Sequence, residues 1–276
     1  MLDLRPMELG EILDGALTIY RRHFGLFVRL GVATLFMPVL LNVYIAFSGG
    51  QAQHLGLWFF TNYVLQSFAT LILTAGAIRV ISDSYLGREP QLSEALSLGA
   101  SKLWPLFVVG LAKGVIMMLI VGAASLFIFL FISLQAGVTS GLLVVATGVA
   151  GVWFLLWVAC GYAVTTQSVV LEALPGASES LGRSWDLTRG RRGTVFVIVF
   201  VADLIVYLPI VGVAGVGAAM AVESPMTQQV FQVVVAAMPM VLTPILSCVY
   251  TLMYYDLRVR REGFDLQLLG QQLGPA

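Results

Sequence analysis

Three ionisable side chains lie inside long apolar stretches of this sequence, where they have the greatest capacity for chemistry. Arg29 lies five residues after Phe24, Lys113 eight residues after Pro105, and Asp203 ten residues after Gly193. At about 1.5 Å of rise per helical residue, these positions are roughly 7, 12 and 15 Å along their helices. A charge at such a depth in a membrane is costly, so each side chain is expected to be paired, neutralised or exposed to water.

The three residues differ in how easily they can escape the apolar interior. Arg29 and Lys113 have long stems that can reach lipid headgroups, which is a purely structural explanation for both. Asp203 is too short for this, and Pro209, six residues later, can loosen the helix beside it. We predict that Lys113 and Asp203 meet as a buried ion pair. Such a pair can serve as structural reinforcement or as a substrate or proton site, and the sequence leaves both open.

The elements that carry these residues are long apolar runs. The chain has 276 residues, of which 59% are hydrophobic and 11% are charged. Six stretches are long enough to cross a hydrocarbon core of about 30 Å. The sequence therefore predicts an all-α integral membrane protein with six transmembrane helices, near Phe24–Phe47, Leu57–Ile78, Pro105–Leu134, Leu142–Val170, Val195–Ala221 and Val230–Met253.

The basic residues predict the orientation of these helices. Apart from Arg29 and Lys113, every Lys and Arg belongs to the termini or to the connections that follow the second and fourth spans. The other three connections contain none. Because basic residues concentrate on the cytoplasmic side of membrane proteins, both termini are expected to be cytoplasmic.

An internal repeat is the next expectation. Three segments begin with a proline, contain an acid soon afterwards, and run directly into an odd-numbered span; their prolines are Pro6, Pro90 and Pro175, and their acids are Glu11, Glu94 and Glu179. Their apolar residues recur at helical spacing, as in amphipathic helices at a membrane interface. We predict one membrane domain, 1–276, with three pseudo-repeats of an interfacial helix and two transmembrane helices (about 6–88, 90–173 and 175–257) and a cytoplasmic tail, 258–276. The alternative is that proline and charge simply mark the inner connections of a multispan protein.

Charged residues at the predicted cytoplasmic side form two kinds of candidate site. Candidates for binding anionic lipid or phosphate are two arginine groups: Arg189, Arg191 and Arg192, and Arg258, Arg260 and Arg261. The alternative for these arginines is that they only fix the topology. Candidates for closing the bundle are the acids at the ends of the even-numbered spans, Asp83, Glu172 and Asp256. We predict that Asp256 binds a basic side chain or a helix N-terminus; otherwise it is a solvated surface acid.

Three segments resemble a known family. RPMELGEILDGALTIYRRHFG, ESLGRSWDLTRGRRG and YYDLRVRREGFDLQLL are similar to the membrane domain associated with bacterial glycerophosphoryl diester phosphodiesterases. The resemblance implies a six-helix protein of the bacterial plasma membrane, related to phospholipid or cell-envelope physiology, but it implies no established activity. The catalytic barrel of the fusion proteins is expected to be absent, because the chain has only two histidines, His23 and His54, and no length left for a barrel.

Catalytic patterns are missing from the sequence. It contains no HExxH, no GxSxG, no cluster of His, Cys and acids at metal-ligand spacing, and no glycine loop that cradles phosphate. We therefore predict no catalytic residue, no metal and no cofactor, and we expect that the protein is not an enzyme. Its expected partners are membrane lipids, mainly anionic ones, and an envelope protein, but not nucleic acid.

Two functions remain after this exclusion. The favoured one is a carrier or channel for a lipid-related or small anionic molecule, supported by the repeat, by Lys113 and Asp203, and by Pro239 and Pro244, which predict a kinked or broken sixth helix. The alternative is a non-catalytic scaffold or partner subunit of a cell-envelope or phospholipid-metabolism complex. A GxxxG pattern at Gly110 and Gly114 is typical of close helix packing and fits either.

Overall fold

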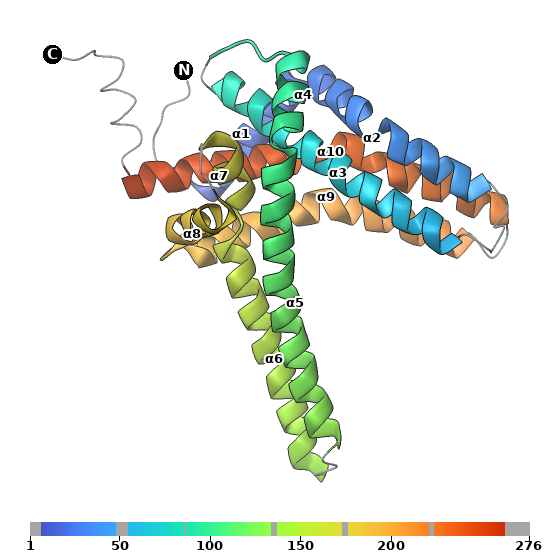
Figure 1. Ribbon diagram of the computed structural model, residues 1–276, viewed down its shortest axis with the longest axis vertical. Helices are drawn as coiled ribbons and strands as arrows, with labels where there is room; N and C mark the ends of the chain where they lie inside the picture. Colours follow the sequence, from blue (N-terminus) through green and yellow to red (C-terminus); the bar gives the residue numbers. More distant parts are fainter. Residues whose placement is uncertain are drawn as a thin grey trace. The chain divides into compact units, whose positions relative to one another are not determined.

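Long helices dominate the computed structural model (Figure 1), which describes residues 7–47, 55–85, 87–133, 137–172, 176–220 and 224–262. Within these ranges the chain is helical and contains no strand. Six segments are long and apolar enough to cross a membrane, which confirms the predicted spans by length and composition. The helices are α1 (Leu9–Arg22), α2 (Phe24–Phe47), α3 (Leu55–Tyr85), α4 (Leu92–Ser101), α5 (Leu103–Ser133), α6 (Gly137–Gly161), α7 (Thr165–Leu171), α8 (Ala177–Thr188), α9 (Arg192–Met220) and α10 (Pro225–Glu262).

The chain divides into two compact units. The first unit comprises Met1–Trp104 and Ile198–Ala276, and the second comprises Pro105–Val197. The boundaries lie in α9 and near the start of α5. The three pseudo-repeats stay a prediction. α10 continues to Glu262 and so includes the first residues of the predicted tail, 258–276, whose cytoplasmic location stays a prediction.

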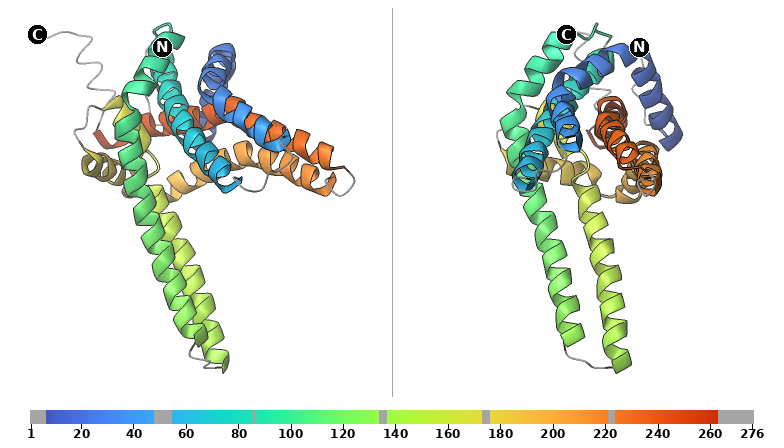
Figure 2. Two further views of the ribbon diagram at one scale, coloured as in Figure 1. Left: turned by 45° about the vertical axis from the view of Figure 1, so that its right-hand side comes forward. Right: turned by 90° about the vertical axis from the view of Figure 1, so that its right-hand side faces the viewer.

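The first unit is built on three long helices that pack against one another. α2, α3 and α10 lie side by side, with α1 against α10 and α4 against α3 (Figures 1 and 2). Apolar side chains between these helices are fully buried, among them Phe27, Leu30, Leu73, Ile78 and Leu252. The hydrophobic core of this unit therefore joins the first helices of the chain to the last.

α10 passes through two prolines without a break. The helix is continuous from Pro225 to Glu262 and includes Pro239 and Pro244. Of the two predicted outcomes, a break is therefore excluded, and the kink stays a prediction. Proline has no N–H, and Pro244 therefore leaves the carbonyl of Met240, four residues earlier, without its usual helical donor. Neighbouring elements cover this loosened segment.

Two residues from the start of the chain supply that cover. Gly31 of α2 lies so close to the Met240 carbonyl that a Cβ atom would overlap the oxygen. Tyr20 of α1, which is 8% exposed, donates a hydrogen bond of 2.9 Å to the carbonyl of Val241. Burial raises the pKa of Tyr20 to about 12, because the apolar surroundings disfavour its anion.

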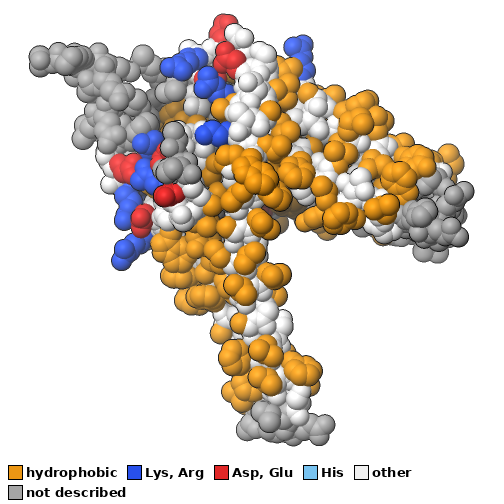
Figure 3. Space-filling view, viewed as in Figure 1, with side chains coloured by type: hydrophobic (Ala, Val, Ile, Leu, Met, Phe, Trp, Pro, Cys, Tyr) orange, Lys and Arg blue, Asp and Glu red, His pale blue; other side chains and the backbone are white. Residues whose placement is uncertain are grey.

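The second unit contains a long hairpin whose side chains are mostly exposed. α5 and α6 run alongside each other in opposite directions, and they meet where a Cβ on Gly151 would lie 3.1 Å from Ala124 (Figures 1 and 2). No residue in the most apolar window of α5 is buried within the protein, compared with 44% for α3. Figure 3 shows orange apolar side chains along these helices. In a membrane these side chains require lipid or another protein to cover them.

The short helices α1, α4 and α8 share one local construction. Each contains the pattern Glu-x-Leu-x-x-small, in EILDGA, EALSLG and ESLGRS. The glutamate is the third residue of the helix in all three cases, where its carboxylate interacts favourably with the positive end of the helix dipole. The residue after the glutamate and the small residue are both buried in each helix, at Ile12 and Ala16, Ala95 and Gly99, and Ser180 and Ser184. The three helices therefore bury the same face.

Candidate functional site

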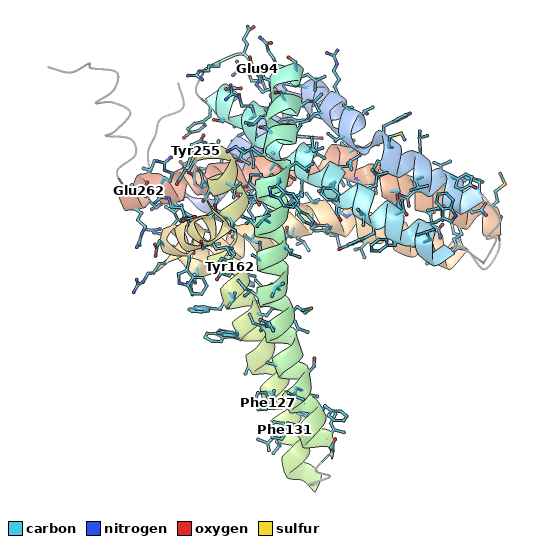
Figure 4. All side chains as sticks on the ribbon, in the orientation of Figure 1. Glu94, Phe127, Phe131, Tyr162, Tyr255 and Glu262 are labelled. Carbon is cyan, nitrogen blue, oxygen red and sulfur yellow. The ribbon has the colours of Figure 1, made fainter. Side chains whose placement is uncertain are left out.

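The second unit contains a helix interruption that the sequence analysis did not predict. α6 ends at Gly161, and after a turn the chain resumes as α7 at Thr165. Interrupting a helix in a membrane leaves carbonyl groups without donors, and these must be satisfied by other groups. Figure 4 labels Tyr162 at this point, beside α8.

Side chains from three other elements satisfy the free carbonyls. The carbonyl of Gly161 accepts hydrogen bonds from Ser184 (2.9 Å) and Thr188 (3.3 Å), both on α8. The carbonyl of Tyr162 accepts from the hydroxyl of Thr165 (2.9 Å) and from Nζ of Lys113 on α5 (3.3 Å). A lysine at a helix C-terminus is also stabilised by the helix dipole. Lys113 therefore has a structural partner for its charge.

Gly161 has no side chain, and this allows α8 to approach the turn closely. A Cβ on Gly161 would lie 2.5 and 2.6 Å from two ring atoms of Trp185. The Trp185 ring also contacts the ring of Tyr162, with centroids 5.3 Å apart, and the ring of Trp157, with centroids 5.0 Å apart and nearly perpendicular planes. The close approach of α8 thus builds an aromatic cluster at the end of α6.

Arg192, the first residue of α9, lies in the angle between the two tryptophans. The centre of its guanidinium is 3.8 Å from the ring centroid of Trp157 and 3.8 Å from that of Trp185. Its Nε atom is buried and has no hydrogen-bond partner within the described residues. We call Trp157, Trp185 and Arg192 the tryptophan corner. Cation–π contacts of this kind contribute from about 0.5 to 2 kcal/mol, with the larger values for desolvated pairs.

Asp203 belongs to the first unit, whereas Lys113 belongs to the second. The carboxylate of Asp203 accepts a hydrogen bond of 3.3 Å from the hydroxyl of Tyr250 on α10. In the part of the chain that the structure describes, no Lys, Arg or His forms an ion pair with it. Each member of the predicted Lys113–Asp203 pair thus has another partner in its own unit, and the pair stays a prediction. Arg29 is exposed on α2, as a side chain that reaches headgroups would be.

Asp256 links the end of α10 to the beginning of α1. Its carboxylate accepts a hydrogen bond of 2.7 Å from the backbone N–H of Met7, just before α1. Both carboxylate oxygens also accept from Nε of Arg260 at 2.9 Å, and Arg260 donates to the carbonyl of Met7 at 2.7 Å. Asp256 is 6% exposed. It therefore contacts both a basic side chain and the backbone at a helix start, in a nearly dry environment.

The other two acids engage short helices as well. Glu172 accepts hydrogen bonds from Arg183 of α8, the shortest at 2.9 Å. Asp83, which is 3% exposed, pairs with Arg79 at 2.8 Å, and Arg79 reaches Glu94 of α4 at 3.2 Å. Of the remaining arginine candidates, Arg258 pairs with Glu262 at 3.2 Å, while Arg189, Arg191 and Arg261 are exposed.

His23 makes a polar contact that the sequence did not predict. It lies between α1 and α2, and its Nε2 is 3.0 Å from the hydroxyl of Ser84. Burial and the nearby charge of Arg22 lower the pKa of His23, so the imidazole favours its neutral form. Among the described residues, no three His, Cys, Asp or Glu side chains are grouped so that they could hold a metal ion.

Comparison with family models, curated proteins and solved structures gave no match. The class of protein therefore follows from the chain itself. Six helices able to span a bilayer, joined by short amphipathic helices, define a polytopic membrane protein. The resemblance to the membrane domain of phosphodiesterases stays an expectation that depends on its three sequence segments.

Proposed function

We propose that the protein is a carrier or channel of the bacterial plasma membrane for a lipid-related or small anionic molecule. The observation that supports this most directly is Asp203. It lies in the middle of α9, and its hydrogen-bond partner is the neutral hydroxyl of Tyr250. An intramembrane carboxylate without a cationic partner has to be protonated or in contact with water.

Asp203 would then couple a proton to the movement of the substrate. Uptake of a proton neutralises the carboxylate and lowers the repulsion of an approaching anion, and its release restores the charge. A purely structural aspartate has no need of water access. Access of water to position 203 is therefore the property that distinguishes the two roles.

Cysteine labelling tests this access directly. In a background with Cys160→Ala and Cys248→Ala, a cysteine is placed at Asp203 or, as a matched control, at the adjacent Leu204, which is 48% exposed on an apolar surface. A membrane-impermeant charged methanethiosulfonate reacts only with thiols in contact with water. We expect labelling of D203C and none of L204C. Absence of labelling at position 203 would contradict a wet pathway.

Transport is measured in proteoliposomes. One arm follows the transfer of an acyl-labelled fluorescent phosphatidylglycerol between leaflets, with dithionite to bleach the outer leaflet. The other arm follows uptake of glycerol 3-phosphate. The proposal expects one of these rates to exceed that of protein-free vesicles and to fall in Asp203→Asn. Rates equal to those of empty vesicles in both arms would reject it for these substrate classes.

A partner subunit without catalysis is the second candidate, and the exposed α5–α6 hairpin favours it. Nothing lies within 4 Å of a Cβ placed on Gly110 or Gly114. This GxxxG motif, which is typical of close helix packing, therefore has no helix packed against it in the single chain. A photo-crosslinking residue at the exposed Met118 tests this in native membranes, with the fully buried Leu73 as control. A defined protein adduct specific to position 118 supports a partner, and adducts with lipid alone contradict one.

A further inference from the structure

The tryptophan corner holds an arginine between two indole rings at the start of α9. We propose that it binds the phosphate group of an anionic phospholipid, with Arg192 as the central contact and Arg189 and Arg191 as flanking charges. The shared chemistry is that of a phosphate monoester or diester anion. The proposal does not depend on transport, because it concerns a fixed lipid in the second unit and not the pathway at Asp203.

The geometry of Arg192 prepares it to bind an oxyanion such as a phosphate group. Two indole rings hold the guanidinium from different sides at 3.8 Å, so its orientation is fixed before a ligand arrives. Among the described residues, the buried Nε atom of Arg192 has no hydrogen-bond acceptor, and no acid forms an ion pair with Arg192. Arginine presents donors in a rigid fork that matches phosphate oxygens. The side chain is therefore oriented, and its Nε atom is buried without an acceptor.

Two neighbouring arginines add positive potential near Arg192. Arg189 directly follows α8 and Arg191 directly precedes α9, and neither forms an ion pair within the described ranges. Gly190, between them, has a φ of +85°, a left-handed conformation that glycine adopts without strain. This turn joins the basic residues to the N-terminus of α9, whose first turn contains no acid. A helix N-terminus adds further attraction for an anion.

The position in the chain favours a lipid over a free anion. The basic turn connects the short amphipathic α8 to the 29-residue apolar α9. Tryptophan and arginine side chains at the junction of an amphipathic helix and an apolar span are typical of the headgroup level of a bilayer. An anionic lipid offers its phosphate at that level while its acyl chains cover exposed apolar side chains of the same unit.

Native mass spectrometry of the purified full chain in a mild detergent measures the proposed binding. The protein is titrated with phosphatidylglycerol, with phosphatidylcholine as a lipid without net charge, and with inorganic phosphate as a competitor. We expect phosphatidylglycerol to remain bound under conditions in which phosphatidylcholine dissociates. Displacement of the lipid by millimolar phosphate would instead assign the site to a free anion and overturn the lipid assignment.

Substitutions then localise the lipid. Arg192→Gln should weaken phosphatidylglycerol binding by about fivefold or more, as loss of one interfacial charge implies. Arg192→Lys retains the charge but not the planar fork, and it should restore only part of the affinity. Gly161→Ala retains every charge but displaces the Trp185 ring, so it should also weaken binding. The matched control is Arg22→Gln, which removes an exposed arginine of the first unit and should leave binding unchanged.

Each outcome is read on protein whose folding has been verified by its thermal transition. Equal retention of phosphatidylglycerol by Arg192→Gln and Arg22→Gln would overturn the proposal. If Arg192→Lys binds phosphatidylglycerol as tightly as the wild type, charge alone determines the affinity. The tryptophans would then have no part in recognition, which would overturn their role in the proposal. If Arg192→Gln does not fold, the Arg192→Lys and Gly161→Ala variants still test the same contacts.

Discussion

α10 of the first unit and the α6–α7 connection of the second solve the same problem with different chemistry. Both are apolar spans in which the helical hydrogen bonding is interrupted, at Pro244 in one and after Gly161 in the other. In α10 the neighbouring groups are neutral: the α2 backbone at Gly31 packs against the Met240 carbonyl, and the Tyr20 hydroxyl donates to the next carbonyl, that of Val241. In the second unit the cover includes hydroxyls and the ammonium group of Lys113.

The difference explains how the two units tolerate polar groups. Neutral cover adds no charge, so the first unit can surround α10 with apolar side chains. In the second unit the ammonium group of Lys113 lies inside a span. The partial negative charge at the C-terminal end of a helix stabilises this cation, as a carboxylate would otherwise do. A charged residue in a membrane span therefore does not by itself indicate a substrate site. The charge of Lys113 is compensated by the end of a helix, whereas the partner of Asp203 is a neutral hydroxyl.

The largest expected effect tests the close approach in the first unit. Gly31→Ala places a methyl group against the Met240 carbonyl, which belongs to the backbone and cannot move aside easily. We expect a loss of about 3 kcal/mol of stability, at the upper end of overpacking effects. Thermal unfolding in detergent measures it. The control is Gly25→Ala in the same helix, where nothing lies within 4 Å, and it should be neutral or stabilising by up to about 1 kcal/mol. Similar melting temperatures for the two variants would refute the close packing.

A smaller effect is expected from removing the charged cover in the second unit. Lys113→Met leaves the Tyr162 carbonyl with the hydroxyl (2.9 Å) and the backbone N–H (3.4 Å) of Thr165, and should cost about 1 to 2 kcal/mol. A double-mutant cycle with Asp203→Asn distinguishes this role from the predicted ion pair. Additive losses support the helix-end role, and a coupling above about 1 kcal/mol would support the pair instead.

The smallest effect concerns the neutral cover. Tyr20→Phe removes the hydrogen bond to Val241 and should cost about 1 kcal/mol near neutral pH. The pKa of Tyr20 is raised in the folded protein from 10.0 to about 12. Its contribution is therefore complete below pH 10 and is lost as the pH rises towards 12. Unfolding at pH 8, 10 and 11.5 should show the gap between wild type and Tyr20→Phe narrowing. A gap that does not change with pH would mean that the Tyr20 hydroxyl is not protected.

Hydropathy was sufficient to predict the six spans but not the interruption between α6 and α7. The apolar run that ends at Val170 continues through Tyr162, Ala163 and Val164 without a proline, so nothing local predicts that α6 stops at Gly161. The interruption depends on Ser184 and Thr188, more than twenty residues later, which supply the missing donors. A glycine inside a span followed by a short helix with two small hydroxyl residues is the signal that could have suggested it.

The candidate sites were predictable to different degrees. Charge counting identified Asp256 and Arg192, because charged residues are rare in this chain. Their partners were not predictable: Met7 is 249 residues from Asp256, and Trp157 reaches Arg192 only because α8 packs closely against the end of α6. The acid at the start of α1, α4 and α8 was visible in the sequence. The small buried residue five positions later became visible only when the three helices were compared.

The contact between Met7 and Asp256 also bears on how the protein is made. Synthesis proceeds from α1 to α10, so the first unit cannot complete its packing until its last helix has entered the membrane. Until then, Gly31 and Tyr20 face lipid or the insertion machinery instead of α10, while the whole second unit has already been synthesised. Assembly of the first unit is thus a late event in biogenesis. A ribosome stalled before residue 225 would leave α1 and α2 as an unfinished surface open to membrane chaperones and proteases.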